Sequence, residues 1–157
     1  MKYRKLSEDD AEQFWNLMNQ LDYETKYILY EPGERTKNLP EIEAIIRDSV
    51  EGEDFLIVAE TDNRLVGYLS AQKGRLNRIA HSAYWYFKGL SWKRNRNRVF
   101  FWAEEQKVMR LELTVICENE VAKHLYTNNG FQIEGIKRKS VYIDGTYLDE
   151  YYMARIR

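Results

Sequence analysis

A chain of 157 residues can enclose one hydrophobic core and is short for several, so we expect a single domain over residues 1–157. The apolar fraction of 44% argues against disorder, and a net charge of −1 gives no overall electrostatic reason to bind nucleic acid or a membrane. The single cysteine, Cys117, excludes an intramolecular disulfide and a cysteine-rich metal cluster. The first residues lack an apolar signal core and no run is long enough to span a bilayer, so we expect a cytoplasmic protein without a membrane partner.

Apolar periodicity divides the chain into strands and helices. Apolar side chains recur every three or four residues in the helical stretches, whereas β-branched and aromatic runs mark the strands. Asp62-Asn63 and Asp144-Gly145 are turn signals between such runs and predict two hairpins, and Gly130 suits the left-handed end of a helix. The predicted elements are, in chain order, a strand over 2–6, helices over 7–21 and 41–50, strands over 55–60, 65–71 and 80–87, a helix over 99–106, a strand over 111–116, a helix over 118–128, and strands over 132–143 and 146–156.

The order of these elements predicts a mixed α/β fold. A strand and two helices come first, a meander of strands follows, and two further helices precede the last hairpin. Helices that carry one apolar stripe must bury it against a sheet, so the chain is expected to form layers of helices on a sheet.

The segment from Val108 to Phe131 holds the most specific motif in the chain. An apolar strand leads into a short helix that carries polar and aromatic residues at fixed spacing, namely Asn119, Ala122, Leu125, Tyr126, Gly130 and Phe131. This pattern resembles the acyl-CoA site of the GNAT superfamily of N-acetyltransferases. The resemblance covers nearly the whole chain and implies a GNAT fold, with a central, mostly antiparallel, twisted sheet of about six to seven strands flanked by helices. It also implies acetyl-CoA as co-substrate and an acetyl group transferred to a primary amine.

The resemblance assigns roles to individual residues of this segment. Tyr126 is implied to point at the thioester sulfur, where a phenol can protonate the departing thiolate as a general acid. Asn119 is implied to contact the cofactor arm, and backbone amides near Val115 to Cys117 are expected to bind the thioester oxygen. A tyrosine in a helix is more often a packing residue, and Cys117 reads better as a small buried hydrophobe than as a nucleophile.

Two acidic residues are candidates for the acceptor side of the site. Glu24 and Glu31, with Thr25 and Arg35 nearby, lie where related enzymes line the amine pocket, although solvation at the surface explains each acidic residue equally well. The final strand pair resembles the branch that acetylates protein N-termini, polyamines and small amines. The expected partner is therefore a small-molecule or peptide amine, and homodimer formation stays open.

The stretch from Trp92 to Arg98, upstream of the Val108–Phe131 segment, departs from the family pattern. The family binds the pyrophosphate of the cofactor with backbone amides of a glycine-rich loop, and bulky side chains here would block that approach. One interpretation is that side chains of this stretch hold the phosphates directly, in which case the residues are Trp92, Lys93, Arg94 and Arg96. A second is nucleic-acid binding by a basic run in which Trp92 is interleaved with Lys88, Lys93, Arg94, Arg96 and Arg98. We rank it lower because short basic runs are usually solvated surface.

A third interpretation is that residues 84–101 are a compensated frameshift. Read one nucleotide later with permitted codons, residues 84–100 give I-G-I-L-K-G-L-V-G-K-G-I-G-T-E-F-F, which is a good glycine loop. The single tryptophan codon makes Trp85 and Trp92 glycine under any choice of codons. The alternative to an enzyme is therefore a catalytically inactive GNAT-fold binding module, and resequencing the gene tests the frameshift.

Overall fold

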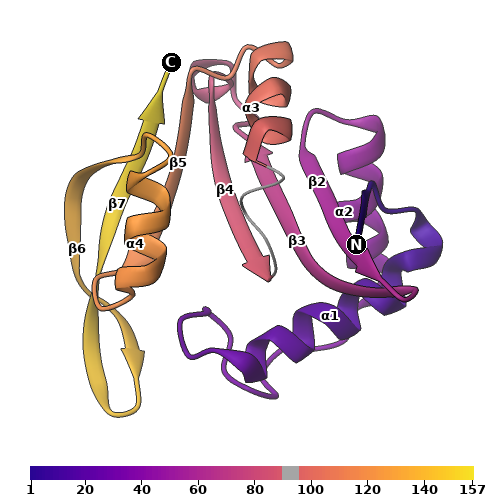
Figure 1. Cartoon of the computed structure of the whole chain (residues 1–157), viewed down its shortest axis with the longest axis horizontal. Helices are drawn as coiled ribbons and strands as arrows, with labels where there is room; N and C mark the ends of the chain where they lie inside the picture. Colours follow the sequence, from indigo (N-terminus) through magenta and orange to yellow (C-terminus); the bar gives the residue numbers. More distant parts are fainter. Residues whose placement is uncertain (90–95) are drawn as a thin grey trace.

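The computed structural model describes residues 1–89 and 96–157, which form one seven-stranded sheet with helices on both faces (Figure 1). The strands are β1 Lys2–Arg4, β2 Phe55–Thr61, β3 Arg64–Lys73, β4 Ser82–Gly89, β5 Arg110–Ile116, β6 Gln132–Ile143 and β7 Thr146–Ile156. The α-helices are α1 Ala11–Glu24, α2 Leu39–Glu51, α3 Arg96–Glu105 and α4 Glu120–Thr127, and short 3-10 turns span Glu8–Asp10 and Asn77–Ile79.

The strand order of the sheet is β1-β2-β3-β4-β5-β7-β6, and neighbouring strands are antiparallel with one exception. The exception is the central pair β4 and β5, which run parallel and pair only from Ser82 to Tyr84 on β4. Both strands continue beyond this short pairing, β4 to Gly89 and β5 to Ile116. The second halves of β4 and β5 are therefore not paired with each other, although each strand still pairs with its outer neighbour, β3 or β7.

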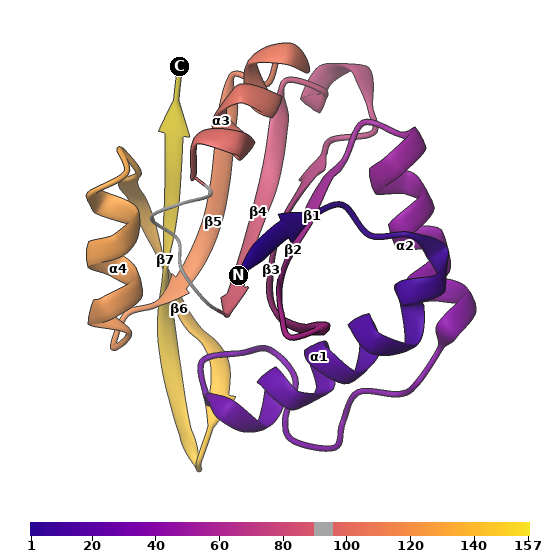
Figure 2. The same ribbon diagram turned by 45° about the vertical axis from the view of Figure 1, so that its right-hand side comes forward.

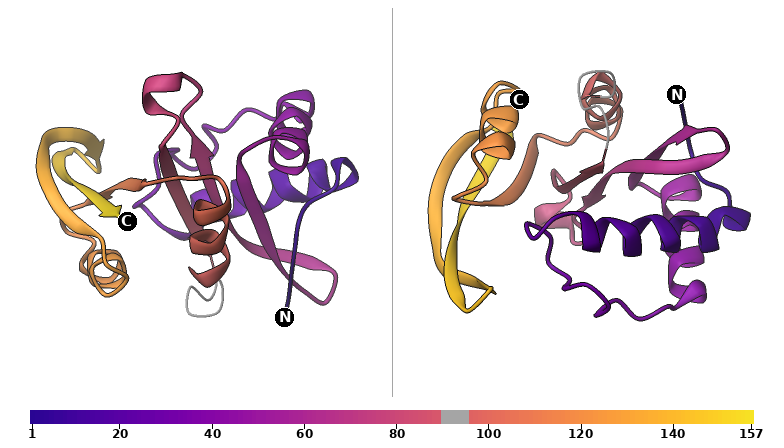
Figure 3. Two further views of the ribbon diagram at one scale, coloured as in Figure 1. Left: turned by 90° about the horizontal axis from the view of Figure 1, so that it is seen from above. Right: turned by 60° about the horizontal axis from the view of Figure 1, so that its bottom comes forward.

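Two hydrophobic cores lie on opposite faces of the sheet. Figure 3 shows the helices on either side of the strands. One core joins α1 and α2 to β2 and β3, with Phe14, Ile46 and Val58 at most 2% exposed. The other joins α3 and α4 to the middle of the sheet, around Leu113 and Phe131. Each strand contributes alternate residues to the two faces, which is why both faces can be apolar in a mixed α/β fold.

The predicted elements are confirmed, with shifts at their ends. The two hairpins turn at Asp62-Asn63 and Asp144-Gly145, all of which have positive φ angles, and Gly130 has a φ angle of 84° after α4. Helix α4 begins two residues later than predicted because the Asn119 side chain caps it. Within the described ranges 1–89 and 96–157, no helix has the length and apolar character of a membrane span.

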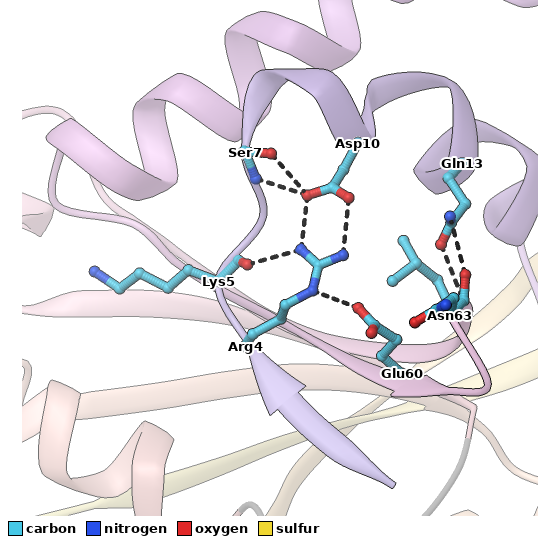
Figure 4. Close-up of polar contacts among 8 residues, drawn as sticks. Arg4, Lys5, Ser7, Asp10, Gln13, Glu60 and Asn63 are labelled. Carbon is cyan, nitrogen blue, oxygen red and sulfur yellow. Dashed lines mark hydrogen bonds and ion pairs between the residues drawn. The ribbon is translucent and has the colours of Figure 1, made fainter.

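Arg4 joins the first strand to the start of α1 and to β2 (Figure 4). Its guanidinium donates to both carboxylate oxygens of Asp10, at 2.7 and 2.8 Å, and to Glu60 of β2. Asp10 also accepts from the Ser7 backbone amide at 2.8 Å. The Arg4 hydrogen bond lowers the pKa of Asp10 from 3.8 to about 2.

We expect Arg4→Met to lower the free energy of unfolding by about 1 kcal/mol at neutral pH, because these charges are partly screened by water. The low pKa of folded Asp10 adds stability above pH 3.8, and that contribution is lost as the pH falls through about 2. Urea unfolding at several pH values should therefore show the difference between the two proteins shrinking in acid. Lys5→Met, at the adjacent exposed lysine, is the control, and a difference independent of pH would contradict this account.

Candidate active site

A cleft of about 590 Å³ opens where β4 and β5 diverge. In Figure 1 the two strands separate below their short paired segment, and α4 lies on the far side of β5. The cleft is also bordered by the loop that follows α1 and by the β6–β7 hairpin, which lie near each other in Figure 2. The residues that line it include Thr25, Tyr27, Ile28, Leu29, Tyr84, Tyr86, Lys88, Thr114, Val115, Ile116, Asn119, Ala122, Leu125, Tyr126, Lys137, Ser140 and Glu150.

Tyr84 is the last residue of β4 that pairs with β5, and it stands at the start of the cleft. Its hydroxyl accepts a hydrogen bond from the Thr114 backbone amide at 3.0 Å and lies 2.8 Å from the Thr114 hydroxyl. The Tyr84 hydroxyl thus accepts the hydrogen bond that the Thr114 amide would donate to a backbone carbonyl of β4 if the parallel pairing continued. The Tyr84–Thr114 contact therefore helps the two strands part without leaving this amide unpaired.

Tyr126 projects from α4 into the wall of the cleft. It is 9% exposed, and its ring packs edge-on against Phe131 at 5.8 Å between ring centroids. Burial raises the pKa of Tyr126 to about 12, with a smaller contribution from the neighbouring Tyr84. The phenol is therefore protonated at neutral pH and available as a hydrogen-bond donor or acid, as the sequence resemblance expects.

The other predicted residues of this segment differ in what they offer a ligand. Val115 and Asn119 line the cleft, although the Asn119 side-chain oxygen already accepts from the Ala122 amide at 3.2 Å. The Cys117 amide donates to Asp149 of β7 at 2.9 Å and thus points away from β4. Because amides alternate sides along a strand, and the Thr114 amide faces Tyr84, the Ile116 amide points toward the gap. Burial raises the pKa of the Cys117 thiol, which makes it a poor nucleophile.

The predicted acceptor residues are only partly on the cleft wall. Thr25 lines the cleft, whereas Glu24 and Glu31 are exposed and lie outside the residues that line it. Arg35 turns toward α1 and donates to both carboxylate oxygens of the buried Asp22, at 2.6 and 3.0 Å. This buried ion pair fixes the position of the loop that carries Thr25.

Lys88 is a cleft residue that the sequence indicated only as a member of the basic run, not as part of an acceptor site. It is half-buried near the end of β4, and burial lowers the pKa of its ammonium group to about 8. The strand predicted over 80–87 stops one residue short of Lys88, whereas β4 continues to Gly89. Strand alternation from Tyr84 and Tyr86, continued by one residue, was the signal that could have placed Lys88 on their face.

The residues predicted to hold phosphate directly are mostly outside the described part of the chain. Trp92, Lys93 and Arg94 fall there, and of Arg96 the structure describes only the backbone, as the first residue of α3. Their role in phosphate binding stays a prediction.

The chain is similar to known acetyltransferases in sequence and in structure. The sequence model of the acetyltransferase (GNAT) domain matches residues 4–152. An L-amino acid N-acetyltransferase from Escherichia coli, AaaT, is 32% identical over 109 residues, which cover 64% of this chain and 67% of that protein. A GNAT-family acetyltransferase from Streptococcus pneumoniae has the same fold, with a TM-score of 0.89, 21% identity, and coverage of 99% of this chain and 98% of that one. The structure of yncA from Salmonella typhimurium, solved with acetyl-CoA, aligns with a TM-score of 0.81 at 15% identity and covers 99% of this chain and 93% of that one.

Proposed function

Because the chain belongs to the GNAT family of acetyltransferases, we propose that its cleft takes acetyl-CoA as co-substrate and transfers the acetyl group directly to a primary amine. The observation that carries the proposal is the buried, protonated Tyr126 beside the gap between β4 and β5. A donor that stays protonated at neutral pH suits a reaction that must release a thiolate. No covalent enzyme intermediate is needed, since the amine itself is the nucleophile.

The residues of the cleft divide the chemistry between them. The amine nitrogen attacks the thioester carbonyl, and the Ile116 amide is placed to donate to the oxygen, where negative charge develops. As the carbon–sulfur bond breaks, Tyr126 gives its proton to the sulfur and the CoA thiol leaves. The proton released by the acetylated nitrogen passes through water and restores the Tyr126 phenol, so protons balance over the turnover.

The acceptor enters from the side of the loop after α1 and the β6–β7 hairpin, in this proposal. The loop contributes Thr25 and Tyr27 to the cleft, and the hairpin contributes Lys137, Ser140 and Glu150. Glu24 and Glu31, which lie outside the cleft lining, would contact an acceptor that extends out of the cleft. The acceptor classes in question are a small amine, a polyamine and a protein N-terminus.

The second candidate is a GNAT-fold binding module without activity. It is favoured by a specific feature of the sequence, the bulky stretch from Trp92 to Arg98, in which no glycine occurs. A backbone that cannot approach a pyrophosphate cannot donate its amide hydrogens to the phosphate oxygens.

Calorimetric titration with acetyl-CoA separates the two candidates. An enzyme should bind one acetyl-CoA with a dissociation constant between about 1 μM and 1 mM. The matched protein carries the shifted reading at residues 84–100, and the frameshift hypothesis predicts that it binds acetyl-CoA more tightly. If the chain as printed gives no heat at millimolar cofactor, the module is favoured over the enzyme.

A further inference from the structure

Lys88 occupies the acceptor side of the cleft. The rings of Tyr84 and Tyr86 lie 4.7 Å apart on one face of β4, and strand alternation places Lys88 on that same face. Its register partner on β3 is Tyr68, whose ring packs on Phe14 of α1 at 5.2 Å. The Lys88 side chain therefore extends along the face that α1 and the following loop cover, opposite to α3 and α4.

Among the described residues, no carboxylate forms an ion pair with Lys88. Asp22 is the acidic side chain that faces it, and both oxygens of Asp22 are occupied by Arg35 at 2.6 and 3.0 Å. The other charged neighbour of the ammonium is the Arg35 guanidinium, which lowers the pKa of Lys88 further, and the uncharged phenols of Tyr68 and Tyr86 lie on the same face of the sheet. Across residues 1–89 and 96–157, no carboxylate lies within 4 Å of the Lys88 ammonium.

The second lysine of the cleft shows the contrast. Lys137 lies 3.9 Å from Glu150 and is half-exposed, so its charge is balanced and hydrated. Lys88 is more deeply placed and unbalanced, which is costly unless an anion joins it. An amine acceptor that carries a carboxylate would bring such an anion to Lys88.

We propose that Lys88 binds the carboxylate of the acceptor, so that the acceptors of this cleft are amino acids and related amines that carry a carboxylate. The inference rests on the proposed acetyl transfer and deepens it by naming the substrate class. A polyamine would bring a second cation next to Lys88. At a protein N-terminus, the carboxyl group of the first residue is part of a peptide bond, so no carboxylate lies next to the reacting amine. Both of those acceptor classes are therefore disfavoured.

The test compares amino acids with the same amines lacking the carboxylate, such as leucine with isoamylamine and phenylalanine with phenethylamine. Release of the CoA thiol is measured for the unaltered chain and for Lys88→Met, Lys88→Arg and the exposed control Lys5→Met. Lys88→Met should lower kcat/KM for the amino acids about 30-fold or more, mainly through KM, because it removes one partner of a buried charge pair. The two simple amines should change by no more than about threefold, and Lys88→Arg should keep most of the preference because it keeps the charge.

Three results would overturn the assignment. If Lys88→Met lowered kcat/KM equally for amino acids and simple amines, Lys88 would not bind the acceptor carboxylate, although the proposed acetyl transfer would still stand. A preference of the unaltered chain for simple amines would lead to the same conclusion. Weaker calorimetric binding of acetyl-CoA to Lys88→Met would assign Lys88 to a cofactor phosphate, whereas absence of product from every amine would refute the proposed acetyl transfer itself.

The lysine does not depend on the frameshift hypothesis. The shifted reading of residues 84–100 also has lysine at position 88, so both readings place the same cation at this point of the chain.

Discussion

Tyr126→Phe is expected to lower kcat for amine acetylation about 100-fold or more, because the phenol that protonates the leaving thiolate is removed. The ring stays in place against Phe131, so the melting temperature and the affinity for acetyl-CoA should remain close to those of the unaltered chain. Release of the CoA thiol measures kcat, and calorimetry measures cofactor binding.

The pH dependence gives this prediction a second readout. Since burial raises the pKa of Tyr126 to about 12, the acid stays protonated over the working range. The kcat of the unaltered chain should therefore show no alkaline fall between about pH 7 and pH 10. An unchanged kcat in Tyr126→Phe would show that Tyr126 is not the acid, whereas an alkaline fall with an apparent pKa near the ordinary tyrosine value would show that burial does not raise the pKa of Tyr126.

Trp85→Ala is expected to have the largest effect on stability, about 3–5 kcal/mol. Trp85 is 2% exposed and packs between Phe131 at 5.3 Å and Phe100 at 5.9 Å, so truncation leaves a cavity that rigid neighbours cannot fill. Urea or thermal unfolding gives the free energy difference. The control is Phe101→Ala, at an aromatic residue of the same region that is 61% exposed, which should change stability by no more than about 0.5 kcal/mol.

The Trp85 prediction also bears on the shifted reading, which places glycine at position 85. In the chain as printed, the core around Phe100 and Phe131 is filled by the indole. Glycine at position 85 alone should therefore be as damaging as alanine. A stable Trp85→Gly protein would contradict the packing described here.

Much of the fold could be predicted from the sequence because its signals are local. The turn residues Asp62-Asn63 and Asp144-Gly145 and the helix stop at Gly130 adopt the backbone angles that their sequence favours. The apolar periods of two and 3.6 residues located the strands and helices between them. Tyr126 was found because the motif that surrounds it is short and specific.

The rest of the site depends on residues that are distant in the sequence. Tyr84 bonds to Thr114, thirty positions away, and Arg35 reaches back to Asp22 of α1. Lys88 is unusual only because the nearby carboxylate, Asp22, is already paired with Arg35, and no local sequence pattern predicts that pairing. Such relations arise when the sheet assembles, so the polar network of the cleft could not be read from spacing alone.

The most direct test of the central claim is turnover of the chain as printed, with acetyl-CoA and a panel of amines followed by mass spectrometry and by thiol release. We predict one acetyl group on the amine nitrogen of at least one acceptor, formed together with an equal amount of CoA thiol and lost in Tyr126→Phe. If the folded protein acetylates no member of the panel at saturating acetyl-CoA, the assignment of this cleft as an active acetyltransferase site is contradicted.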